Sequence, residues 1–509
     1  MIPSEGRTIA GTGQFLVDNA QCAECGLHAC THYLDCDGDS DDDAISHMDG
    51  EASSLALTAD AATVLANARA DLRRTIWSLA WPVIITFLSQ SLVGLVDVLM
   101  VGRLGAAAVA AVGVGAQVLS AVSVVMTAVG TGTLALVARH IGANERHEAQ
   151  RVLAQSVVAA ALGSVVIITP VMIWTHLMVQ VFGVEPHVVD LSAEFVRFVM
   201  LSIPGSAVLF VIASALRGAG DTRTPLAIGL LVNVANIVAN YILIFGKLGF
   251  PALGVRGSAL ATTFAFTLGA ALGMVWLVRG SLVLSMTMRQ LSPHARTIKR
   301  VLTIGYPAAI EQLFMQIGFF IYVIFAARYG TDAVAAYFIG VRILAMSFLP
   351  GFGFAAAAAA LVGQNLGAGN PQLAEHSGWL ANRLSVYFMS ACGLVIVALA
   401  RPIAAVFVDN AEVIADTVSF IYMLGLAQPL MAVDFTLGGA LRGAGDTRFP
   451  LVTVLVAFYG CRLGFAYVVS SLLHLSLPWL WAALIGDYIA RAALKAWRFH
   501  GGRWKTITV

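Results

Sequence analysis

Three carboxylate side chains stand inside long apolar stretches of the sequence, where a charge is costly. Asp97, Glu311 and Asp434 each lie in a run of about 20 or more mostly apolar residues. A carboxylate in this setting can bind a cation or take up and release a proton. No Lys or Arg lies deep in the stretches around Asp97, whereas Arg342 and Arg462 accompany the other two acids. We predict Asp97 as the main cation-coupling residue. Glu311 and Asp434 are either further coupling residues or members of a structural ion-pair network.

Uncharged polar residues follow in the same half of the chain. Asn233, Asn236 and Asn240 are spaced by three and four residues, so they share one face of a helix. Thr262, in the next apolar stretch, is a weaker candidate of the same kind. We predict these four residues as lining of a substrate cavity. Asparagines also serve as hydrogen-bond links between membrane helices, and the sequence leaves both interpretations open.

The elements that must position these residues are membrane-spanning helices. Of the 509 residues, 59% are hydrophobic and only 12% are charged, against roughly 25% charged residues in a soluble domain. Mean hydropathy is +0.82, so a soluble globular fold is excluded. Twelve apolar runs are long enough to cross a bilayer as helices. They are 76–101, 107–137, 152–180, 193–215, 225–246, 254–279, 302–328, 333–362, 380–408, 417–440, 450–472 and 476–497.

The basic residues orient these spans. Assigning alternate loops to one side of the membrane gathers 20 Lys and Arg residues there, Lys495 among them, and leaves five on the other side. Basic loops stay in the cytoplasm. We therefore predict a multi-pass protein of the plasma membrane with both termini cytoplasmic and the lipid bilayer as its surroundings.

A sequence repeat divides the body of the chain. The octapeptide Leu-Arg-Gly-Ala-Gly-Asp-Thr-Arg occurs at residues 216–223 and again, unchanged, at residues 441–448. The same offset of 225 aligns Pro82 with Pro307 and Arg103 with Arg328. An even number of spans per half makes the repeats parallel, typically around a central cavity. The repeated residues that we predict to structure a loop turn, with local Arg–Asp ion pairs, are Arg217, Gly218, Gly220, Asp221, Arg442, Gly443, Gly445 and Asp446.

Two further charge pairs are predicted to be structural. Asp487 and Arg491 are spaced i,i+4 near the inner end of the last span, and Glu194 and Arg197 are spaced i,i+3 near the outer face.

The chain is predicted to have three parts: a tail over 1–74, a six-helix bundle over 75–290, and a second bundle with the carboxyl end over 291–509. The segment before Leu72 carries 13 acidic and two basic residues, so disorder is expected. Four cysteines there include one Cys-x-x-Cys, but the second half of a zinc motif is missing. Alternatively, Met48 is the true start. The weak metal candidates are Cys22, Cys25, Cys30 and Cys36.

Together, these motifs resemble the MATE family of multidrug and toxic compound extrusion transporters, most closely its DinF-like bacterial branch. The resemblance covers residues 75–498 and rests on the two octapeptides, on Leu-Val-Asp-Val-Leu-Met-Val-Gly at 95–102 and on Gly-Gln-Asn-Leu-Gly-Ala-Gly at 363–369. It implies an antiporter that exports an organic cation or other toxic compound as ions enter. It also implies that Asp97 matches the family's first-span aspartate.

The remaining expectations follow from this resemblance and from the residues. The unpaired Asp97 favours protons over sodium ions, and no cofactor is expected. The substrate is predicted to be cationic or amphipathic, and the chain a monomer without a nucleic-acid partner. No His-Glu-x-x-His, Gly-x-Ser-x-Gly or Walker A pattern occurs, so we expect no enzyme activity. The alternative function is that of a lipid-linked precursor flippase.

Overall fold

The computed structural model describes residues 46–183 and 185–508, with the backbone alone for residues 46–66, 68 and 69. The chain divides into two compact units, Met1–Arg69 and Ala70–Val509. Regular structure in the described residues is all helical. The first half comprises α2 (Ser46–Gly102), α3 (Ala106–Gly142), α4 (Arg146–Ile173), α5 (Thr175–Gln180), α6 (Pro186–Met200), α7 (Ile203–Gly218), α8 (Arg223–Phe245) and α9 (Val255–Val278).

After the short η1 (Met288–Leu291), the second half repeats the helices of the first half. It comprises α10 (Ala295–Ala327), α11 (Thr331–Ser347), α12 (Leu349–Gly367), α13 (Pro371–Ala398), α14 (Ala400–Ala405), α15 (Ala411–Gly443), α16 (Arg448–Val454), η2 (Leu455–Leu463), α17 (Gly464–Tyr467), η3 (Val468–Leu472), α18 (Leu477–His500) and η4 (Arg503–Thr506).

The twelve predicted spans all fall on these helices. In the described part of the chain, ten spans are long and apolar enough to cross a membrane, with α11 and α12 counted as one. The pair α6 and α7, bent by 48°, makes an eleventh. The twelfth is α18, which has 24 residues but carries three charged side chains in its interior: Asp487, Arg491 and Lys495.

The backbone is helical from Ser46 onward, within the segment predicted to be a tail. Residues 46–74 are rich in Ala and Leu and lack Pro, which favours a helix. The boundary of the tail and its disorder stay predictions. The four tail cysteines lie outside the described residues.

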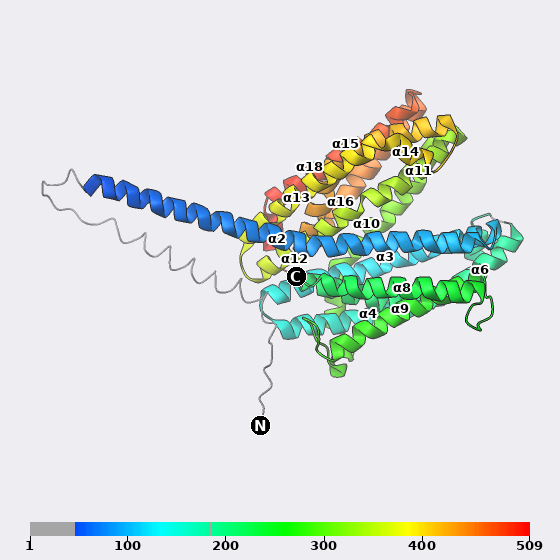
Figure 1. The fold of residues 1–509 in the computed structure, drawn as a ribbon, viewed down its shortest axis with the longest axis horizontal. Coiled ribbons are helices and arrows are strands. Elements are labelled where there is room, and N and C mark those ends of the chain that lie inside the picture. The colour runs from blue at the N-terminus through cyan, green and yellow to red at the C-terminus, as the bar shows by residue number, and fades with distance from the viewer. Residues whose placement is uncertain (1–45, 184, 509) are drawn as a thin grey trace. The chain divides into compact units, whose positions relative to one another are not determined.

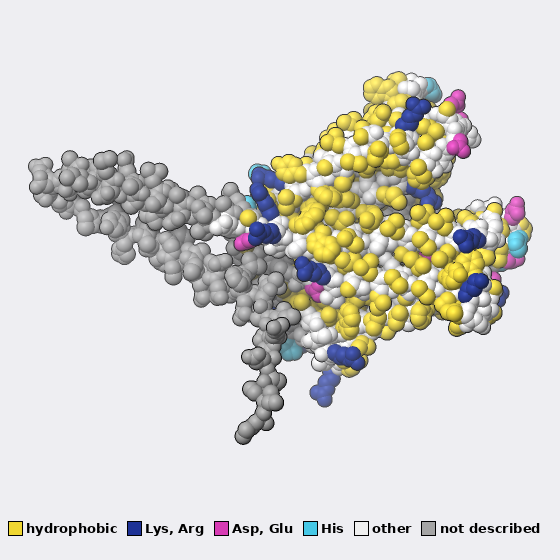
Figure 2. Space-filling model, in the orientation of Figure 1, with side chains coloured by type: hydrophobic (Ala, Val, Ile, Leu, Met, Phe, Trp, Pro, Cys, Tyr) yellow, Lys and Arg dark blue, Asp and Glu magenta, His cyan; other side chains and the backbone are white. Residues whose placement is uncertain are grey.

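Each half has its own apolar core, and two further cores join the halves. One cluster extends from Val101 to Ala259, and another from Tyr322 to Tyr488. A third packs α2 against α12 and α15, and a fourth places the start of α10 against α3. Figure 2 shows apolar side chains along the flanks, with most charged side chains near the two ends, as expected of a surface that faces lipid.

The halves meet at the end that carries both octapeptides, here called the inner end. There α10 and α12 pack along α3 (Figure 1). A Cβ atom added at Gly305 would lie 1.6 Å from the carbonyl oxygen of Ala128, and one added at Gly367 would lie 2.0 Å from that of Arg139. The helix backbones therefore touch, as in the small-residue packing of membrane helices.

Toward the opposite, outer end, the same helix faces become exposed. Gln117 and Ala121 lie on the face of α3 that carries Ala128, and both are exposed. Gly353 of α12 is buried against α2, whereas Arg342, on the same face, is exposed. Figure 2 shows a hollow between the two halves, at the end where α6 and α14 lie in Figure 1. The halves therefore enclose a cleft that is closed at the inner end and open at the outer end.

Overpacking the inner contact is expected to open it. In Gly305→Val, the new side chain meets the backbone of Ala128. Overpacking costs about 1–3 kcal/mol, enough to shift a two-state equilibrium about 5- to 150-fold. A cysteine introduced at the buried Ala135 should then react faster with a maleimide. Gly163→Val, where a Cβ atom has no neighbour within 4 Å, is the control. Equal labelling rates in the two variants would contradict the prediction.

The carboxyl-terminal segment also connects the halves at the inner end. Trp504 is fully buried, with its ring stacked on Phe499 at 4.6 Å between centroids. Arg139 of α3 donates hydrogen bonds to the carbonyl oxygens of Ile507, at 2.8 Å, and Ala444, at 3.3 Å. An arginine of the first half is therefore held by two backbone carbonyls of the second half.

Deletion of residues 503–509 is expected to shift the protein away from the conformation that is closed at the inner end, because Arg139 loses its bond to Ile507. Hydrogen bonds to charged groups contribute about 1.5–3 kcal/mol each. Spin labels at Ala106 and Thr331, the exposed first residues of α3 and α11, should report a shorter mean distance in a cysteine-free background.

The control for this deletion is Lys505→Met. Lys505 pairs with Glu375 of α13 at 2.6 Å, so its partner lies within the second half. This variant should keep the wild-type distance distribution. A wild-type distribution in the deletion variant would show that the segment does not hold the inner end closed.

Candidate functional site

The structure brings four of the predicted site residues into one chain of hydrogen bonds. Asp97 of α2 accepts a 2.6 Å bond from the Asn240 Nδ2 of α8. The same Nδ2 donates to the Oδ1 of Asn236 at 3.1 Å, and the Nδ2 of Asn236 donates to the Oγ1 of Thr262 of α9 at 3.4 Å. Three helices of the first half therefore converge on the carboxylate.

This chain is largely closed to water. Asn240 is fully buried, Asn236 is 6% exposed and Asp97 is half-buried. Among the described residues, no Lys, Arg or His pairs with Asp97, as the sequence indicated. In this conformation the two asparagines support Asp97 and do not line an open cavity.

Asn240 suits both protonation states of its partner. An amide donates through its nitrogen and accepts through its oxygen. Asn240 Oδ1 is buried and has no hydrogen-bond partner in the part of the chain that the structure describes. A turn of the amide would present this oxygen to a protonated Asp97. The pair can therefore accommodate Asp97 with or without a proton.

Asn233 stands apart from this group. Its Nδ2 donates a 3.0 Å hydrogen bond to the Oγ of Ser89 on α2, and the residue is half-buried. The three asparagines share one helix face, as predicted, but Asn233 links α8 to α2 separately from Asp97.

In the second half, the acids are held by bases. Glu311 of α10 pairs with Arg442 of α15 at 2.7 Å. Asp434 of α15 pairs with Lys495 of α18 at 2.5 Å, and Arg491 lies 4.0 Å from its other carboxylate oxygen. This geometry favours the structural ion-pair interpretation of Glu311 and Asp434.

Asp487 extends the same network. It accepts from Arg491 at 2.7 Å, which confirms the predicted pair, and it lies 3.7 Å from Arg462. The Arg462 guanidinium also lies 4.6 Å from the ring centre of Tyr322 and 5.0 Å from that of Phe458, so two aromatic faces help to stabilise its charge.

For two residues of this region, Lys495 and Arg342, the structure differs from what we predicted from the sequence. Lys495 was assigned to the inner loops, yet it is 2% exposed and pairs with Asp434. Lys495 lies four residues after Arg491, on the helix face that also carries Asp487, and this spacing could have indicated that the three side chains interact. Arg342 was expected to neutralise the acids of this half. Its side chain is instead exposed, and it forms no ion pair with another described residue.

Both octapeptides form the expected turn. Gly220 and Gly445 have φ angles of 88° and 89°, a region that favours glycine. Gly218 and Gly443 lie against neighbouring helices, where an added Cβ atom would come within 2.7 and 2.1 Å of a carbonyl oxygen.

The predicted ion pairs within the octapeptides are wrong. Asp446 pairs instead with Arg498 of α18 at 2.8 Å. Asp221 accepts hydrogen bonds from the backbone N–H groups of Arg223 and Thr224 at 3.1 and 3.0 Å. The aspartate of the first copy therefore stabilises the start of α8, and that of the second copy anchors α18.

The arginines of the two octapeptides also differ. Arg442 pairs with Glu311, but the offset of 225 places Thr86 where the second half has Glu311. Arg217 accordingly has no recorded ion pair with a described residue, and its guanidinium lies 5.7 Å from the ring centre of Phe87. Duplication has preserved the turn but not the charge pairing.

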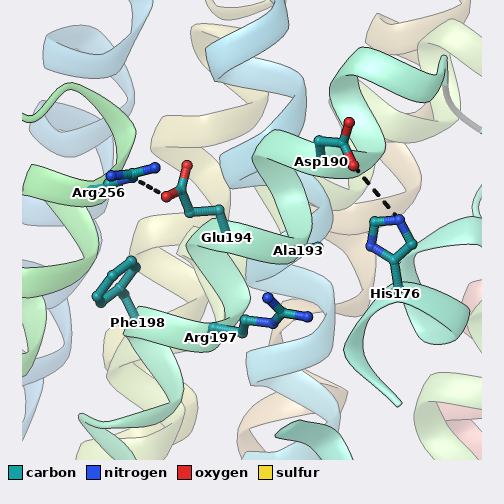
Figure 3. Close-up of a pocket in the computed structure, with 7 residues that line it drawn as sticks. All are labelled: His176, Asp190, Ala193, Glu194, Arg197, Phe198 and Arg256. Atoms are coloured by element: carbon teal, nitrogen blue, oxygen red, sulfur yellow. Dashed lines mark ion pairs between the residues drawn. The ribbon is translucent and has the colours of Figure 1, made fainter. Parts of the chain in front are cut away.

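A separate polar cavity of about 440 Å³ lies at the outer end of the first half, between α5, α6 and α9. Figure 3 shows Glu194 directed toward Arg256 and Asp190 toward His176, with 3.5 Å between the paired atoms of the second pair. The predicted pairing of Glu194 with Arg197 is therefore wrong, because Arg256 at the start of α9 reaches the carboxylate instead. Asp97 is not among the residues that line this cavity.

Two repeated halves of apolar helices, with a cleft open at one end, define a membrane transporter built from parallel repeats. A sequence profile of the MatE family matches residues 82–242 and 307–468, once in each half. The chain therefore belongs to the MatE family, whose members are transporters and not enzymes.

Known relatives agree with this assignment. The chain is 31% identical over 442 residues to a probable multidrug resistance protein NorM of Thermotoga maritima, covering 86% of this chain and 94% of the relative. It is 29% identical to the multidrug resistance protein NorM of Burkholderia vietnamiensis, with 83% and 92% covered. A solved MOP superfamily transporter from Pyrococcus furiosus superposes with a TM-score of 0.80 at 25% identity, covering 86% of this chain and 97% of that one. The DinF-like branch stays a prediction.

Proposed function

We propose that the chain is a secondary antiporter that exports organic cations and other amphipathic toxic compounds in exchange for protons. It is a multi-pass membrane protein with a small-molecule substrate, as its family membership indicates. The names of its NorM relatives support drug efflux as the direction and purpose of transport.

One observation carries the coupling proposal: the 2.6 Å hydrogen bond between Asp97 and Asn240. A carboxylate without a basic partner inside a membrane protein is costly unless it exchanges a proton or a cation. Asn240 supplies a neutral partner that serves both states of the acid. Because no basic side chain pairs with Asp97 among the described residues, the carboxylate can gain and lose a proton without breaking an ion pair, and this favours protons as the coupling ion.

The exchange follows from competition at Asp97. The ionised carboxylate favours a conformation or a bound substrate that needs the negative charge, and protonation from the outside removes that charge. Substrate release and proton entry are then linked through one equilibrium. Rocking of the two halves about their inner contact would carry the site from one side to the other.

The second half has a different role in this proposal. Its acids are neutralised by Arg442, Arg491 and Lys495. Protonation of Glu311 or Asp434 would therefore break an ion pair, which makes these two residues poor sites for proton coupling. We assign these residues to stabilisation of the second bundle.

The cellular setting is part of the same proposal. The distribution of Lys and Arg supports a plasma-membrane protein with both termini and the octapeptides on the cytoplasmic side. A monomer contains both halves and hence a complete cleft. A lipid-linked precursor flippase stays the alternative, and the NorM relatives favour efflux over it.

The deciding experiment is transport in proteoliposomes under separately imposed gradients. The full chain should accumulate a fluorescent organic cation when a proton gradient is imposed, and a sodium gradient of the same size should have no effect. Transport driven by sodium alone would overturn proton coupling. An absence of transport under both gradients, together with flipping of a lipid-linked precursor, would favour the flippase.

A further inference from the structure

Arg342 is a charged side chain that the coupling site and the ion-pair network do not use. It lies 11 residues from Thr331, the first residue of α11, hence about 16 Å along the helix from the outer end. This depth is inside a hydrocarbon layer of about 30 Å. Arg342 is nevertheless exposed, and no recorded ion pair joins it to another described residue.

Helix geometry places Arg342 on the face of α11 that looks into the cleft. At 100° per residue, Arg342 and Gly353 differ in direction by about 20°. Gly353 contacts α2 of the other half, where an added Cβ atom would lie 2.4 Å from Ile84. The exposed residues of α11 share this face, and the opposite face, with Tyr337 and Leu344, is buried.

The cost of membrane charge agrees with this direction. A guanidinium facing lipid at this depth would be strongly unfavourable, so intramembrane arginines face the protein interior or water. The outer part of the cleft is open, and it supplies that water. Arg342 is therefore hydrated and accessible in the outward-open state.

The surroundings of Arg342 on the cleft walls combine apolar and amide groups. Phe338 and Met346, one turn to either side, are 55% and 53% exposed. Across the cleft, the repeat-equivalent position on α3 is the exposed Gln117. On α10, Gln312 is also exposed, two turns outward from the contact at Gly305. One cation, two amides and apolar side chains suit an amphipathic ligand that carries an anionic group.

We propose that Arg342 binds the carboxylate of those amphipathic substrates that carry one, when they occupy the cleft. This inference rests on the proposed efflux function and assigns to it a residue that selects among substrates. The planar guanidinium can bind both oxygens of a carboxylate. Gln117 and Gln312 provide further donors, and Phe338 packs against the apolar part of the ligand.

A matched pair of dyes tests this assignment. Fluorescence anisotropy measures binding of a rhodamine with a free carboxylate, and of its methyl ester, to the full chain in phosphatidylcholine nanodiscs. In Arg342→Gln, the carboxylate dye should bind about tenfold more weakly, as expected for loss of one charge-assisted bond, and the ester should be affected less than about twofold. Arg342→Lys should restore part of the affinity, because it keeps the charge but loses the planar fork.

The control is Arg256→Gln, which removes an arginine of the outer cavity and should leave both dyes unchanged. Equal weakening of both dyes in Arg342→Gln, or no change in either, would overturn the assignment. Loss of the carboxylate preference when phosphatidylglycerol replaces part of the phosphatidylcholine would assign Arg342 to a lipid headgroup and would also overturn it. Because binding is measured without a gradient, failure of transport would refute the proposed antiport and leave this result standing.

Discussion

Replacing Asp97 with asparagine is expected to reduce gradient-driven efflux to the level of protein-free vesicles. The new amide has the shape of the carboxylate, and its Oδ1 can still accept the bond that Asn240 donates at 2.6 Å in the wild type. It cannot take up or release a proton at any useful pH. The fold should therefore persist while exchange stops, and the variant should bind substrate as the protonated wild type does, because the asparagine is neutral. Efflux from proteoliposomes under an imposed proton gradient measures the effect.

The control for this substitution is Asp190→Asn. Asp190 also lies in the first half, but at the outer end, where its partner is His176 at 3.5 Å. This variant should transport at close to the wild-type rate. Wild-type efflux by Asp97→Asn would remove Asp97 from the coupling mechanism. Loss of efflux together with a lower unfolding temperature would indicate a structural role and count equally against the proposal.

Much of the fold could be predicted because the membrane imposes it. A run of about 20 apolar residues has few alternatives to a helix in a bilayer, so all twelve predicted spans coincide with helices. The exact repeat at an offset of 225 marks the two halves, and the family profile matches once in each. Contacts between the halves were beyond prediction, because they depend on carbonyl oxygens such as those of Ala128 and Arg139 approaching glycines of other helices.

The candidate site was only partly predictable for a related reason. Helix periodicity placed Asn236 and Asn240 on one face, and the absence of nearby bases distinguished Asp97. Counting basic residues by side of the membrane, however, assigned Lys495 to the cytoplasmic surface. Its side chain extends back into the bundle toward Asp434. In a side chain as long as that of lysine, the charge can lie far from the backbone position of the residue. Charge pairing across helices therefore required coordinates.

Lys495→Met is expected to destabilise the second bundle by about 3–5 kcal/mol, because it leaves Asp434 buried without its closest counter-charge. Asp434 is 3% exposed. The nearest remaining base, Arg491, lies 4.0 Å away and is also paired with Asp487 at 2.7 Å, and Arg442 is paired with Glu311 at 2.7 Å. The loss should appear as a lower unfolding temperature in detergent and as earlier unfolding in a denaturant titration.

Two comparison variants decide whether pairing is the cause. The double variant Asp434→Leu with Lys495→Met removes both charges and leaves Arg491 paired with Asp487, so it should recover most of the lost stability. Lys505→Met breaks the ion pair with Glu375, whose side chains are 28% and 29% exposed, and should cost only about 0–1 kcal/mol. If the double variant is no more stable than Lys495→Met, packing of the lysine stem and not charge compensation stabilises this region. If Lys495→Met unfolds like the wild type, water reaches Asp434, and the carboxylate becomes a second candidate for ion exchange.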